Sequence, residues 1–149
     1  MLEVYQYFIN LFIEKQKLEG KILVLSPKKE SCDILKEYTE KLLPEYNTCV
    51  HYSGNKVDNF YPYGIIFATS KMLGTGNDID GLRVIINMEP IRSPRNALQV
   101  FGRLREYSYD KDTYYVEIID KSIPSVSSMY RDRKKLLGDL SKKFIQVEF

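Results

Sequence analysis

The chain has 149 residues, of which 44% are hydrophobic and 28% charged, as in one globular domain and unlike a disordered, collagen-like or disulfide-rich protein. Its 22 basic and 20 acidic residues give a net charge of +2, so overall charge does not by itself indicate a nucleic-acid partner. No apolar run is long enough to span a membrane and no signal-peptide pattern is present, so we expect no membrane association and no secretion. Cys32 and Cys49 lack metal-site or disulfide spacing, so we expect reduced thiols in the cytoplasm or another reducing intracellular compartment.

Helical and strand patterns alternate along the chain. In order, the predicted elements are a helix over residues 2–18 ended by Gly20, a strand over 21–26, a helix over 30–43 stopped by Pro44, strands over 48–52, 64–69 and 82–87, a helix from Ser93 to about Glu106, a strand over 113–119, a basic helix over about 125–142 and an edge strand over 144–149. The expected fold class is therefore α/β, with one domain over residues 1–149 that has a mostly parallel sheet and helices on both faces. Functional residues are expected in the loops at the carboxyl ends of the strands, where such sheets bind ligands.

A glycine-rich loop follows the third predicted strand, over residues 68–78. Thr69 offers a hydroxyl and a backbone N–H at the strand end, and Gly76 lets the backbone approach a ligand closely. Asp78 is an acceptor that is able to hold a ribose hydroxyl. The alternative interpretation is a tight loop with a helix-capping aspartate.

A second candidate segment is residues 99–105, on the predicted helix that ends at about residue 106. Gln99 and Arg103 are four residues apart and share a helix face, and the planar guanidinium of Arg103 or Arg105 is suited to phosphate. Gly102 is a poor helix former, so its presence indicates that another backbone or a ligand approaches closely there. The alternative is an ordinary solvated basic helix face.

In this order, the segments resemble the second RecA-like domain of superfamily 2 helicases and translocases. Residues 22–27 resemble motif IV, residues 68–78 motif V and residues 99–105 motif VI, and the resemblance covers about residues 20–120. Within that family, the sequence is most similar to helicases of bacteriophages and large DNA viruses. These share the long motif V, the Gly-Arg-Leu-Arg form of motif VI and an aromatic-rich strand that ends in Ile-Asp before a basic helix.

The resemblance implies roles for the matching residues. Gln99 and Arg103 would face ATP, and Arg103 or Arg105 would be the arginine finger that stabilises charge on the transferring γ-phosphoryl group. Both arginines stay candidates because Arg105 follows Arg103 by two residues, where the family usually has three. Gly76 and Asp78 would lie at the interdomain cleft, with Asp78 near the ribose. The candidate nucleic-acid surface, at the strand ends, comprises Ser26, Lys28, Lys29, Ser53, Gly54, Thr69 and Lys71.

The sequence has no Walker-type phosphate loop, and no Asp-Glu pair follows a predicted strand to hold Mg²⁺. The chain therefore carries half of an ATPase site. We expect the C-terminal half of an ATP-dependent helicase or translocase that acts on nucleic acid, with DNA favoured over RNA. ATP would bind between this domain and a first RecA-like domain, in the same protein or in another chain, which would hold Mg²⁺. The chain alone is expected to be inactive.

Two alternatives come from other classes of protein. One is a stand-alone nucleic-acid-binding or regulatory module that keeps this fold without catalysis, although such a module has no need of Gln99 and Arg103 as sensors of the γ-phosphate. The other is a nucleotide-binding enzyme of flavodoxin-like shape, which is disfavoured because the segment after the first strand, residues 26–29, contains no glycine.

Overall fold

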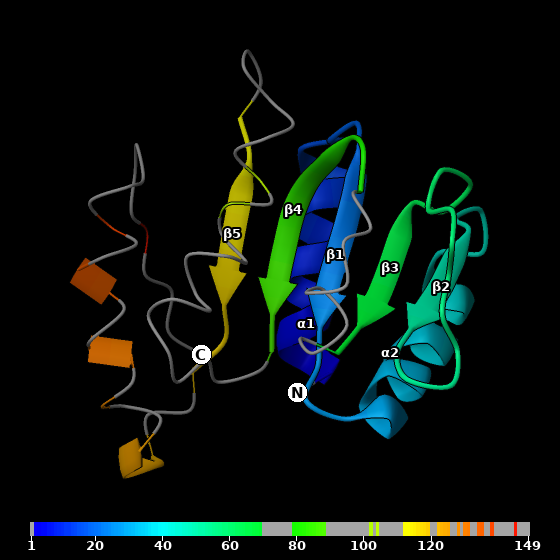
Figure 1. Cartoon of the computed structure of the whole chain (residues 1–149). Coiled ribbons are helices and arrows are strands. Elements are labelled where there is room, and N and C mark those ends of the chain that lie inside the picture. Colours follow the sequence, from blue (N-terminus) through cyan, green and yellow to red (C-terminus); the bar gives the residue numbers. More distant parts are fainter. Residues whose placement is uncertain are drawn as a thin grey trace.

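The computed structural model describes residues 2–69, 79–88 and 112–119, together with positions 102, 104, 122–125, 128, 130, 131, 134, 135, 138 and 145. Within these ranges the chain forms a five-stranded sheet (Figure 1). Its strands are β1 (Lys21–Leu25), β2 (Thr48–His51), β3 (Ile65–Ala68), β4 (Leu82–Asn87) and β5 (Tyr114–Glu117). The five strands predicted from apolar runs are thus confirmed.

The strand order is β2-β3-β1-β4-β5, and every neighbouring pair is parallel. The first strand therefore lies in the middle of the sheet, between β3 and β4. In the flavodoxin-like order 2-1-3-4-5, the first strand lies beside the second. The observed order does not support the flavodoxin-like alternative.

The described helices of the N-terminal half pack on one face of the sheet. These are α1 (Leu2–Ile9), which continues into the π-helical turn η1 (Asn10–Lys15), and α2 (Lys29–Leu42). Figure 1 shows α1 behind β1 and β4. The Tyr5 hydroxyl lies 2.6 Å from the Thr39 hydroxyl, which joins α1 to α2 inside the core.

The opposite face of the sheet carries a second apolar cluster. Side chains alternate along β1, so Ile22 and Val24 face the helices, whereas Leu23 and Leu25 face the other way. Phe60, from the connection between β2 and β3, and the helical residue Leu104 cover this second face. Both faces are therefore buried, as a parallel sheet requires, and the predicted α/β fold with helices on both faces of the sheet is confirmed.

The predicted end of the first helix is wrong. The first helix ends at Lys15 rather than running to residue 18, because Lys17 takes a left-handed φ of 49°. Gly20 does not cap that helix. Its φ is +120°, and a Cβ there would lie 2.2 Å from Arg83 Cγ and 2.7 Å from the carbonyl oxygen of Gly81, so glycine allows the chain to pass close to β4.

The structure describes only isolated positions of the two elements predicted at the C-terminal end, the basic helix and the edge strand. The described positions from 124 to 138 are helical, as expected for the basic helix. Of the segment predicted as an edge strand, Ile145 is the described position, and it has no regular secondary structure and is 69% exposed. In the described part of the chain, no helix is both long and apolar enough to cross a membrane.

Candidate nucleic-acid surface

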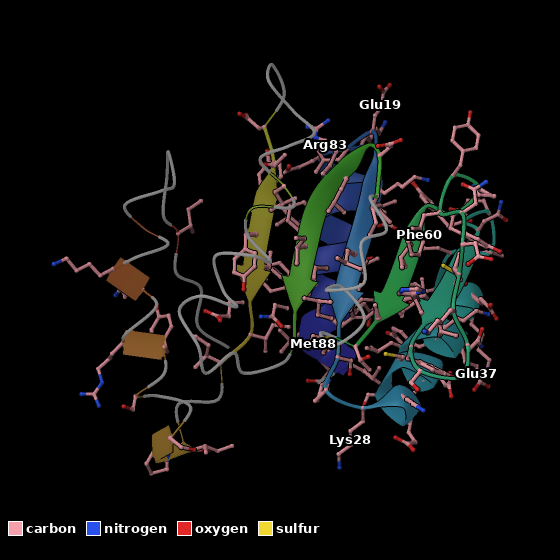
Figure 2. All side chains as sticks on the ribbon, viewed as in Figure 1. Glu19, Lys28, Glu37, Phe60, Arg83 and Met88 are labelled. Atoms are coloured by element: carbon pink, nitrogen blue, oxygen red, sulfur yellow. The ribbon has the colours of Figure 1, made fainter. Side chains whose placement is uncertain are left out.

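The carboxyl ends of the five parallel strands lie along one edge of the sheet. Figure 2 shows Lys28 and Met88 at this edge and Glu19 and Arg83 at the opposite edge. Five of the predicted surface residues follow three neighbouring strands: Ser26 and Lys28 follow β1, Ser53 and Gly54 follow β2, and Thr69 follows β3. The topology thus brings these five positions to one edge, although they are up to 43 residues apart in the sequence.

Ser26 lies beneath this edge rather than on it. Its exposed fraction is 0%, and its backbone N–H donates to the Ala68 carbonyl at 3.0 Å, which extends the pairing of β1 with β3. In the described part of the chain, the Ser26 hydroxyl has no hydrogen-bond partner. Because the residue is buried, this hydroxyl is not exposed for a direct contact with nucleic acid in this structure.

The turn after β2 projects from the edge. Tyr52 and Asn55 exchange two backbone hydrogen bonds, of 3.1 and 2.9 Å, around the exposed pair Ser53 and Gly54. Gly54 has a φ of +91°, and a Cβ at this position would meet nothing within 4 Å. The turn tip therefore needs glycine for its backbone conformation, and none of the described residues would crowd a side chain there.

His51 anchors the connection that leaves this turn. The backbone N–H of Val57 donates to His51 Nδ1 at 3.0 Å, and the ring packs edge-on against Phe60 at a centroid distance of 5.0 Å. The imidazole is 2% exposed. Because Nδ1 accepts this bond, the ring is held as a support for the connection.

The first turn of α2 begins at the same edge. Lys28 precedes it in an extended conformation, and no side chain caps the N-terminus of the helix. Lys29 Nζ lies 5.7 Å from the centroid of the Tyr52 ring, and the Tyr52 hydroxyl donates to Asp33 Oδ1 at 2.7 Å. This hydrogen bond to the Asp33 carboxylate raises the pKa of Tyr52. Sequence analysis missed Tyr52 and Asp33 as members of this surface.

Comparison with known proteins identifies the family. Residues 3–106 match the family described as helicase conserved C-terminal domain. The chain belongs to this family. It is a helicase C-terminal domain of the kind found in ATP-dependent helicases.

Solved structures show the same fold for this helicase C-terminal domain. The C-terminal part of the Fun30 ATPase domain is 17% identical with a TM-score of 0.70, and the match covers 87% of this chain and 43% of that chain. The C-terminal domain of the DEAD-box protein Dbp5 is 14% identical with a TM-score of 0.69, over 93% of this chain and 79% of that chain. The domain thus spans less than half of the Fun30 chain that it matches. A comparison with curated protein sequences found no significant match.

The remaining predicted site residues of this helicase domain lie outside the described residues. They are Lys71, Gly76, Asp78, Gln99, Arg103 and Arg105. Two described positions of the motif VI segment, Gly102 and Leu104, are helical, and Leu104 is 2% exposed. In the described part of the chain, a Cβ at Gly102 would meet nothing within 4 Å. No described backbone therefore approaches closely enough to explain the glycine at this position.

Proposed function

We propose that this chain is the C-terminal half of an ATP-dependent nucleic-acid helicase or translocase. In this proposal, residues 1–149 form one RecA-like domain, which completes an ATP site and a nucleic-acid track together with a first RecA-like domain. The observation that carries the proposal is the family match over residues 3–106. The position of five candidate nucleic-acid residues at one sheet edge supports it.

The proposed ATP site lies between the two domains. Gln99 and Arg103 would face the nucleotide, Gly76 and Asp78 would line the cleft, and the first domain would hold Mg²⁺ and the phosphates. Arg103, or alternatively Arg105, would neutralise charge that develops on the transferring phosphoryl group when the domains close. These roles rest on the motif resemblance.

The proposed nucleic-acid track runs along the carboxyl edge of the sheet. Lys28, Lys29 and Ser53 are exposed there and offer donors to a phosphate backbone. Such contacts carry no base information, so binding by this domain is expected to be independent of sequence and to weaken with salt.

We propose DNA as the substrate and a phage or large DNA virus as the source, on the sequence resemblance alone. We also propose a reducing compartment, because both cysteines are buried and neither forms a disulfide.

An ATPase measurement on a reconstituted pair of domains tests the proposal. The chain alone is expected to show no turnover above background. The first domain would be a RecA-like domain with Walker motifs, sought first in the coding sequence beside this one, and the pair should hydrolyse ATP when single-stranded DNA is added. Turnover by the chain alone near 1 s⁻¹, roughly the low end for enzymes, would refute the half-site argument.

Substitution of the proposed arginine finger tests the same proposal at a single residue. In related enzymes such a finger is worth about 10³–10⁵ in rate. Arg103→Ala should therefore lower kcat of the pair by about that factor and change nucleotide affinity far less, because the arginine acts mainly in the transition state. Arg131→Ala, at an exposed position on the C-terminal helix, is the matched control and should leave kcat unchanged. If Arg103→Ala stays within about threefold of wild type, a barrier change under ~1 kcal/mol, Arg103 is not the finger, and Arg105→Ala decides whether either arginine is.

A further inference from the structure

The helix α2 carries three pairs of opposite charge at a spacing of four residues. Lys36 forms an ion pair with Glu40, and Lys41 Nζ lies 3.5 Å from Glu37 Oε1. Lys29 and Asp33 have the same spacing, one turn from the start of the same helix. Side chains at this spacing are neighbours on a helix surface, so an ion pair is the expected outcome there too.

The third pair does not form. No ion pair joins Lys29 to Asp33, although the structure describes both residues. The Tyr52 side chain contacts both residues instead: Lys29 Nζ lies over its ring, 5.7 Å from the centroid, and its hydroxyl donates to Asp33 Oδ1 at 2.7 Å. Tyr52 thus offers each charge a substitute partner, a ring face for the ammonium and a hydroxyl for the carboxylate.

The contacts of Tyr52 determine how much of the positive charge of Lys29 is offered at the carboxyl edge of the sheet. A ring face attracts an ammonium but uses none of its three N–H donors in a conventional hydrogen bond, whereas an ion pair would use at least one and would offset the positive charge. The Asp33 carboxylate would repel a nearby phosphate, and its bond to Tyr52 holds it at the hydroxyl end of the ring, whereas Lys29 Nζ lies over the ring face. Lys29 therefore keeps its charge and donors for a ligand at the carboxyl edge.

We propose that Tyr52 is a positioning residue for nucleic acid: it prevents the Lys29–Asp33 ion pair and so holds Lys29 ready to bind a backbone phosphate. This inference rests on the proposed function, because it presumes that nucleic acid runs along this edge. It adds Tyr52 and Asp33, which touch no phosphate, to the residues that set the affinity.

The test uses the full chain and a fluorescent oligothymidylate, with affinity measured by anisotropy between 50 mM and 1 M NaCl. Tyr52→Leu removes both ring face and hydroxyl, so Lys29 is expected to pair with Asp33 and one phosphate contact is lost. For single strands each contact contributes about 0.7 to the slope of log affinity against log salt. The slope should fall by about 0.7, which corresponds to an affinity loss of about eightfold at 50 mM and about threefold at 200 mM relative to 1 M salt.

Rescue separates positioning from a general loss of structure. Asp33→Asn removes the competing carboxylate, so it should restore the affinity and slope of Tyr52→Leu while raising wild-type affinity only slightly. It should not rescue Lys29→Met, which has lost the ammonium itself. The matched control is Tyr61→Leu, because Tyr61 is an exposed tyrosine, 84% accessible, with Lys21 Nζ 5.9 Å from its ring centroid at the opposite sheet edge. It should leave binding unchanged.

The outcomes distinguish the two proposals. If the wild-type chain binds no oligonucleotide at low salt, the proposed nucleic-acid track is wrong and the phosphate role of Lys29 is wrong with it. If the wild type binds but Tyr52→Leu binds equally well, or Asp33→Asn raises affinity equally in both backgrounds, the positioning role of Tyr52 is overturned. NMR of the lysine ammonium groups in the free protein gives an independent result. A new Lys29 ion pair in Tyr52→Leu supports the inference, and its absence refutes it.

Discussion

Replacing Ser26 by alanine should stabilise the folded domain, which is unusual for a substitution in a core. Ser26 is 0% exposed at the end of the central strand β1, and its hydroxyl has no hydrogen-bond partner in the described part of the chain. In the unfolded chain the same hydroxyl is hydrogen-bonded to water. Folding therefore removes this bond without replacing it, at a cost of about 1–3 kcal/mol.

The alanine variant removes that cost and introduces a smaller one. It leaves a gap of one oxygen atom, smaller than the methyl-sized cavity that costs about 1 kcal/mol. The net effect should be an increase of about 0.5–2 kcal/mol in the free energy of unfolding. For a chain of this size that corresponds to a rise in Tm of about 2–6 °C.

Urea and thermal unfolding followed by circular dichroism measure this change, and a second buried hydroxyl provides the comparison. Thr39 is also 0% exposed, but its hydroxyl lies 2.6 Å from that of Tyr5 and donates to the Leu35 carbonyl at 2.7 Å. Thr39→Val should therefore destabilise the domain by about 1–3 kcal/mol, because the buried Tyr5 hydroxyl loses its partner. If Ser26→Ala instead destabilises the domain by more than about 1 kcal/mol, the Ser26 hydroxyl has a partner inside the folded chain and the reasoning is refuted.

Two further predictions concern backbone conformation and alkaline pH. Gly20→Ala should cost about 3–5 kcal/mol in unfolding free energy, because a Cβ would lie 2.2 Å from Arg83 Cγ at a φ of +120°. Gly54→Ala, with positive φ but open space, should cost only about 1–2 kcal/mol, and equal costs in urea unfolding would contradict the proposed clash. Burial raises the pKa of the Cys49 thiol from 9.0 to about 12. The folded state therefore keeps this proton more tightly than the unfolded state, and the resulting stability is lost as pH rises from about 9 towards 12. Cys49→Val should lack this component, and identical alkaline unfolding curves for the two proteins would exclude it.

The fold could be predicted because its signals are local. Each strand is a short apolar run such as residues 82–87, and glycine or proline punctuates the chain between elements. The order of the strands could not be predicted in the same way. It depends on β1 pairing with both β3 and β4, and these contacts join segments that are about 40 and 60 residues away in the sequence.

The candidate surface was predictable only as a set of strand ends. Parallel strands bring Ser26, Ser53 and Thr69 to one edge, and that rule needs no side-chain information. Burial could not be predicted from this rule, because the exposed fraction of Ser26 depends on which other residues pack over it. The Tyr52–Asp33 hydrogen bond is likewise a contact between residues 19 apart, on different elements. The sequence did contain one weak indication: Lys29 and Asp33 have the spacing at which an ion pair is expected on a helix. A third residue that contacts both side chains can interrupt such a pair.

The arrangement of α2 allows effects on binding to be separated from effects on folding. Cys32, Leu35 and Thr39 form the buried face of this helix, whereas Lys29 and Asp33 are exposed. Substitutions at the two exposed positions remove no core contact and should leave the free energy of unfolding within about 0.5 kcal/mol of wild type. Ser26, three residues before Lys29, is buried and changes stability when it is replaced. A change in nucleic-acid affinity in Lys29 or Asp33 variants with unchanged unfolding therefore reports on the surface itself. A change in affinity in a Ser26 variant has to be judged together with its change in stability.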